Sequence, residues 1–112
     1  MKLEDRVILR FSIAVSLRCT AQDHPISEHP SPEEAAGYIH SVLELLFSKT
    51  GLEACVEPLA YPAGGKVPLI IHLGSGSECL FWFYPHMETG KLAVQLEESL
   101  QDLFSSAVSV PA

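Results

Sequence analysis

Two short histidine-containing units are the part of the sequence most suggestive of chemistry. Residues 23–30 read DHPISEHP, so an acid, a histidine and a proline follow one another twice. Zinc takes three or four histidine, cysteine or carboxylate ligands at fixed distances. His24 and His29, with Asp23 and Glu28 beside them, are therefore weak candidates for a metal site. The prolines favour an extended backbone and the spacing matches no metal motif, so we favour a stiff, solvated connector and expect no metal or cofactor.

The other histidines and the glycine-rich turns give little support to catalysis. His72 lies in the apolar run PLIIHLG, where a hydrogen-bonded histidine at the edge of the core is the simpler interpretation. The GSGS run at 74–77 lacks the lysine and the following helix of a phosphate-binding loop. We therefore expect the chain not to be an enzyme. A metal-binding or enzymatic domain using His24, His29 and His72 is kept as the third hypothesis.

The charge distribution argues against nucleic acid as a partner. The formal net charge is −7, although the first 18 residues hold four basic and only two acidic side chains. An acidic protein repels a phosphate backbone unless its basic residues are concentrated. The start of the chain has acids among its first five residues and an arginine inside its apolar stretch, so we expect neither a signal peptide nor a membrane segment. Three widely spaced cysteines favour buried thiols in a reducing compartment, and we predict that Cys19, Cys55 and Cys79 are small core residues of a cytoplasmic protein.

The elements that position these residues begin with a strictly alternating segment. Between residues 7 and 19, every second residue is apolar, and the residues between them are largely polar or small. This period of two predicts a long β-strand. On its opposite face, Arg6, Arg10 and Arg18 are in phase. The arginines either discourage unwanted strand pairing or form a basic strip that binds an acidic peptide or a second copy.

The rest of the chain predicts one helix, three strands and a final helix. Ser31, Pro32 and Glu34 are a helix start signal, and Gly51 is a stop signal. Strands are expected at about 53–60, 67–73 and 78–84, with short antiparallel connections. Residues 91–96 fit a fifth strand or the start of a helix over 89–107, and we favour the helix.

The sequence thus predicts a single α+β domain over 1–112, with a loop at 21–30 and a frayed tail at 107–112. The expected order is β-α-β-β-β-α, an antiparallel sheet of about four strands with helices packed on one face. The alternative is one long helix gripped by a curved, five-stranded sheet.

The segment CLFWFY carries large side chains on both faces of its predicted strand, more than helices on one side can cover. We therefore expect a non-enzymatic protein-binding module that acts through association, such as a homodimeric adaptor, a chaperone-like protein or a regulatory subunit. The predicted partner-binding residues are Arg6, Arg10, Arg18, Phe81, Trp82, Phe83 and Tyr84. The partner is a second copy, another protein, or both.

The alternative function is a domain that binds a small apolar ligand. Its pocket would lie between the curved sheet and the helix, and it would be lined by His72, Trp82 and Tyr84.

Overall fold

The first element is a helix, so the expected strand over 7–19 is wrong. Helix α1 runs Leu3–Asp23. No glycine or proline interrupts residues 3–24, and the helix ends two residues before Pro25. On a helix, an alternating pattern spreads apolar side chains over all sides, because each second residue is turned by about 200°. Ile13 and Leu17 lie on the inner side and are buried, so packing against the rest of the domain decides the conformation.

The second element confirms the local start signals of the sequence. Helix α2 runs Pro32–Leu46, and the Ser31 hydroxyl accepts a hydrogen bond from the Glu34 backbone N–H at 3.1 Å. The carboxylate of Glu34 accepts hydrogen bonds from the backbone N–H and the hydroxyl of Ser27. These contacts, the Ser27 hydroxyl first, lower the pKa of Glu34. They fasten the histidine-containing connector to the first turn of α2.

Three antiparallel strands follow, as predicted. They are β1 (Ala54–Pro58), β2 (Val67–Leu73) and β3 (Glu78–Phe83), in the spatial order β1-β2-β3. A tight turn precedes β2, where Gly64 and Gly65 both adopt positive φ.

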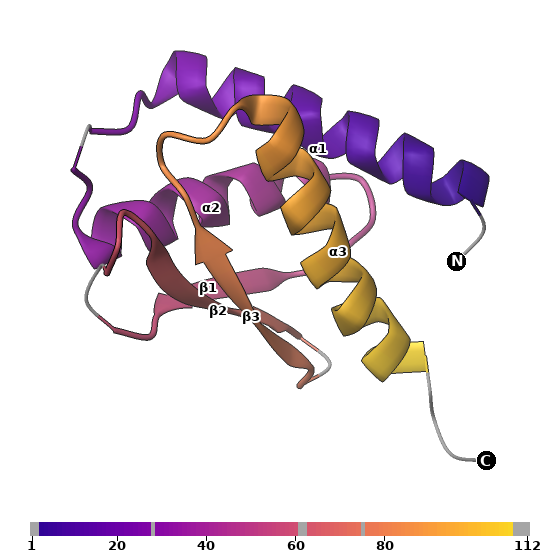
Figure 1. The fold of residues 1–112 in the computed structure, drawn as a ribbon. Coiled ribbons are helices and arrows are strands. Elements are labelled where there is room, and N and C mark those ends of the chain that lie inside the picture. Colours follow the sequence, from indigo (N-terminus) through magenta and orange to yellow (C-terminus); the bar gives the residue numbers. More distant parts are fainter. Residues whose placement is uncertain (1–2, 28, 61–62, 75, 109–112) are drawn as a thin grey trace.

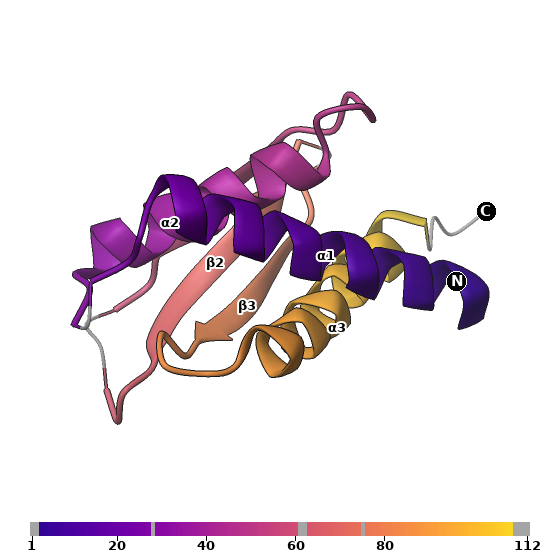
Figure 2. The same cartoon turned by 90° about the horizontal axis from the view of Figure 1, so that it is seen from above.

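Helix α3 runs Thr89–Val108, so residues 91–96 are helical and the alternative five-stranded sheet is wrong. Helices α2 and α3 pack against one face of the sheet, and α1 crosses them on the side away from the sheet (Figures 1 and 2). The inner faces of β2 and β3 meet the helices in one core. The outer side of α1 and the outer face of the sheet therefore lie on opposite sides of the molecule.

This computed structural model describes residues 3–27, 29–60, 63–74 and 76–108, with no side-chain description at 3–4 and 104–108. It is an α+β domain of order α-α-β-β-β-α. The expected loop at 21–30 begins later, because α1 extends to Asp23. Of the expected frayed tail, positions 107 and 108 belong to α3, and 109–112 lie outside the described residues. Within these ranges, no helix combines the length and apolar character that crossing a bilayer requires.

Candidate interaction surfaces

The outer side of α1 carries a contiguous apolar stripe. Residues at positions 7, 8, 11 and 15 share one helix face, since three or four positions correspond to about one turn. Their side chains are exposed: Val7 57%, Ile8 63%, Phe11 69% and Val15 40%. No described element covers them, because α2 and α3 pack on the other side of α1. We call these four residues the α1 stripe.

Two of the three predicted partner-binding arginines are engaged inside the fold. Arg10 Nη2 lies 3.2 Å from Oε1 of Glu97 on α3, and Arg6 Nε lies 3.7 Å from the same oxygen. The Glu97 side chain is 0% exposed, so these contacts join α1 to α3 around a buried carboxylate. Arg18 is exposed and forms no ion pair with any described residue.

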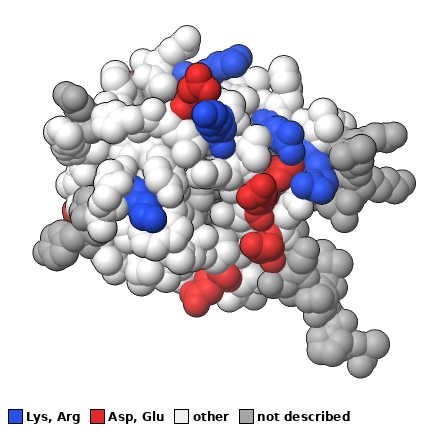
Figure 3. Space-filling view, in the orientation of Figure 1, with Lys and Arg blue, Asp and Glu red and all other residues white. Residues whose placement is uncertain are grey.

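The strand that was expected to align the three arginines is absent, and Arg6 and Arg10 contact Glu97. On a helix, positions 6 and 10 share a side, and position 18 is rotated about 80° from position 10. On the face shown in Figure 3, basic and acidic side chains lie next to one another, without a large patch of one sign.

The outer face of the sheet is the second open surface. Leu80 and Trp82 of β3 point away from the helices and are 46% and 38% exposed. The Lys66 ammonium lies over the Trp82 ring, 4.6 Å from its centroid, and 6.0 Å from the centroid of Tyr84. A cation above an aromatic face is attracted by the ring quadrupole. The two predicted residues Trp82 and Tyr84 thus share a lysine on this face.

Phe81 and Phe83 lie on the inner face of β3 and are buried in the core. Their ring centroids are 6.5 Å apart, and Tyr38 stacks on Phe83. They are therefore not available to a partner of the folded domain, and we leave them out of both surfaces.

His72 lies on the outer face between two carboxylates. Its Nε2 is 3.3 Å from Glu57 and its Nδ1 is 3.2 Å from Glu78. His29 and His86 form an edge-to-face ring pair with centroids 6.2 Å apart. Among the described residues, no group of three or more histidine, cysteine, aspartate or glutamate side chains is placed to hold a metal ion.

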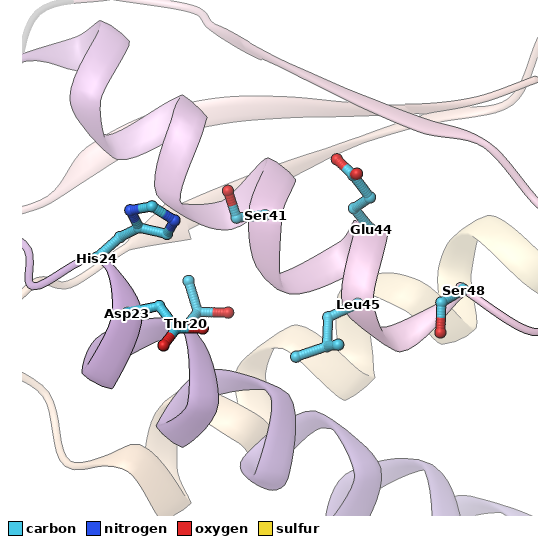
Figure 4. A pocket seen from close by; sticks show the side chains of 7 residues that line it. All are labelled: Thr20, Asp23, His24, Ser41, Glu44, Leu45 and Ser48. Atoms are coloured by element: carbon cyan, nitrogen blue, oxygen red, sulfur yellow. The ribbon is translucent and has the colours of Figure 1, made fainter.

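His24 borders a hollow between the end of α1 and α2. The hollow has a volume of about 360 Å³, and Thr20, Asp23, Ser41 and Leu45 line it together with His24 (Figure 4). No hydrogen bond joins the side chains of Asp23, His24 and Ser41 among the described residues, and the Ser41 hydroxyl donates to the Gly37 carbonyl instead. The group therefore has no organised nucleophile and base.

The three cysteines are free thiols that differ in exposure. Cys19 and Cys55 are exposed, so the expected burial of these two thiols is wrong. Burial, together with the nearby charge of Asp102, raises the pKa of Cys79 to about 11. A thiol with such a pKa is almost fully protonated at neutral pH and is a poor nucleophile.

The residues proposed for an apolar-ligand pocket lie apart from the four hollows that the described residues form. His72, Trp82 and Tyr84 lie on the outer side of the sheet, and none of them lines the four described hollows. Three of these hollows are lined largely by residues of α2 and its neighbouring loops, and the fourth by the start of α2 and the end of β1.

Two features were missed by sequence reasoning: the α1 stripe and the buried Glu97. A strand places Val7, Phe11 and Val15 on the same face as Ile13 and Leu17, whereas the helix separates the two sets. The spacing Leu9, Ile13, Leu17 was the available signal, because it also fits one face of a helix.

Searches against protein-family models, curated proteins and solved structures gave no match to this chain.

Proposed function

We propose that this chain is a non-catalytic protein-association module that forms a homodimer through the α1 stripe. The observation that carries the proposal is the exposure of Phe11, at 69%, between exposed aliphatic neighbours. Contiguous apolar side chains on the surface of a small domain mark an association site, and aromatic residues dominate the centres of interfaces. A dimeric adaptor or regulatory subunit is the role that this property supports.

A second copy is the occupant that fits the stripe best. When two α1 helices pack antiparallel about a two-fold axis at Phe11, Val7 of each copy lies opposite Val15 of the other. The same pairing brings Arg18 of each copy beside the first turn of its partner, whose sequence contains Glu4 and Asp5. Arg18 has no ion-pair partner among the described residues of its own chain, and antiparallel helix dipoles add a small favourable term. The apolar residues of the stripe and the charges in the sequence at its two ends can thus pair with a second copy.

The energetic scale is that of a reversible dimer. Full burial of a large apolar side chain contributes about 1.5–3 kcal/mol, and the two copies together contribute eight such side chains, each already partly covered. Association costs roughly 4–15 kcal/mol in lost translational and rotational freedom. The net free energy of association is therefore modest, so dimerisation should depend on protein concentration. A reducing compartment such as the cytoplasm suits the exposed thiols of Cys19 and Cys55.

The test is sedimentation velocity of the wild-type protein and of Phe11→Ser. We expect the wild-type chain to associate. The substitution should weaken the α1 contact at least tenfold, because each dimer loses two central aromatic rings. A tenfold change in the dissociation constant corresponds to about 1.4 kcal/mol of binding free energy. Leu59→Ser is the matched control, because Leu59 is also an exposed large apolar residue but lies beyond β1. A monomeric wild-type protein at high concentration, or equal weakening by both substitutions, contradicts the proposal.

A further inference from the structure

Strand β3 presents an unpaired backbone edge. It pairs with β2 on one side, and no described strand lies on its other side. The Leu73 N–H donates to the Ser77 carbonyl at 2.8 Å, which fixes the alternation of hydrogen bonds in this hairpin. Cys79 and Phe81 therefore bond to β2, and the backbone groups of Leu80 and its alternate neighbours point to the free edge.

The side chains at this edge combine apolar surface with opposite charges at its two ends. The residues whose backbone points outward are Glu78, Leu80 and Trp82, and their side chains all lie on the outer face of the sheet. Glu78 is at one end, with its side chain 60% exposed. At the other end, the Lys66 ammonium lies over the Trp82 ring. The edge is therefore acidic near Glu78 and basic near Trp82.

We propose that β3 pairs antiparallel with β3 of a second copy, about a two-fold axis at Leu80, to form one continuous sheet. In this register, Leu80 lies opposite Leu80 of the other copy. Glu78 of each copy lies opposite Trp82 of the other, where the Lys66 ammonium is placed to pair with it. Main-chain hydrogen bonds at an open sheet edge supply affinity, and the side chains beside them set the register. The charge pattern of this edge makes a second β3 its complementary strand.

This contact goes beyond the proposed α1 dimer and is independent of it. The sheet and the α1 stripe lie on opposite sides of the domain, so one contact leaves the other free (Figure 1). Each contact is two-fold symmetric, and two different two-fold contacts on one chain build tetramers or longer rows instead of a closed dimer. The edge contact contains few apolar side chains, so it forms at higher concentrations than the α1 contact.

The experiment isolates the edge in a Phe11→Ser background, where the α1 contact is weakened. We expect this variant to dimerise at high concentration in sedimentation equilibrium. Adding Glu78→Lys or Lys66→Glu places like charges opposite each other and should weaken dimerisation at least tenfold. Mixing the two charge variants in equal amounts should restore a heterodimer, because each opposing pair then has opposite charges. Hydrogen exchange at the Leu80 amide should slow in the same samples that dimerise.

The outcomes separate the two proposals. A Phe11→Ser variant that stays monomeric at millimolar concentration overturns the edge contact and leaves the α1 dimer standing. The edge contact is also overturned if neither charge change weakens the dimer. The same holds if the mixture of the two charge variants associates no better than each variant alone. If the wild-type protein and Phe11→Ser associate equally and only the charge variants fail, the edge contact holds and the α1 dimer is wrong.

Discussion

Glu97 is the residue at which charge and packing are most closely linked. Its side chain is fully buried on α3, one carboxylate oxygen faces Arg6 and Arg10, and the other has no hydrogen-bond partner among the described protein groups. A buried carboxylate that loses its counter-charge costs far more than an exposed ion pair contributes. The two arginines therefore stabilise the packing of α1 against α3.

This arrangement predicts a strong coupling between Arg10 and Glu97. In the Phe11→Ser background, which limits the contribution of dimerisation, Arg10→Ala should lower the free energy of unfolding by about 1.5–3 kcal/mol, because Glu97 keeps its burial and loses its nearest cation. In a Glu97→Gln chain the same change should cost less than about 1 kcal/mol, since no buried charge is left behind. Urea denaturation gives both values when it is applied to the Phe11→Ser chain, to its Arg10→Ala and Glu97→Gln variants, and to the variant with both changes. Arg18→Ala is the control and should change stability by about 0.5 kcal/mol or less; equal losses from Arg10→Ala and Arg18→Ala would rule out the coupling.

At the scale of elements, α1 is the part of the fold that differs from the sequence expectation. Its apolar residues repeat with period two, and the same residues, wound into a helix, face both the core and the outside. A strand with that pattern would hide all its apolar residues on one face. The helix hides Ile13 and Leu17 and leaves Phe11 outside. The misleading pattern and the exposed stripe therefore have one cause: a helix that is apolar on two sides.

The conformation of α1 can be tested at Ser12, which lies at the border of the stripe. Ser12→Ala should stabilise the domain, and Ser12→Thr should not, with a difference of about 0.5 kcal/mol between the two variants, because alanine is the better helix former. A β-strand at this position would reverse the order, since threonine is favoured in strands. Each variant changes the side chain by one small group, and thermal denaturation of the two variants decides between a helix and a strand.

The remaining elements could be predicted because their signals are local. Ser31 and Pro32 mark the start of α2 by a hydrogen bond and a fixed φ, and the paired glycines at 64–65 mark a turn by their positive φ. The alternation within β3 predicted that one of its two sets of side chains faces outward, but it could not identify the set with Trp82 as the outer one. The position of Glu97 opposite Arg10 was not predictable, because these residues are 87 positions apart and meet only once α1 is known to be a helix.

On the scale of the whole molecule, the domain is layered, with an open apolar surface at each end of the stack. The α1 layer and the sheet both pack their inner sides onto α2 and α3, which leaves the stripe on one side and the outer face of β3 on the other. The chain as a whole is acidic, at −7, and basic and acidic side chains lie next to one another on the face shown in Figure 3. The net negative charge is unfavourable for a phosphate backbone, and association with protein is the role that we propose.

The most direct test of the account is an isotope-filtered nuclear Overhauser experiment on an equal mixture of carbon-13-labelled and unlabelled wild-type chains. Antiparallel pairing of α1 predicts intermolecular contacts from the Phe11 ring of one chain to the methyl groups of Val7 and Val15 of the other. Phe11 resonances with only intramolecular contacts, at concentrations where the protein is associated, would contradict the central claim that the stripe is covered by a second copy.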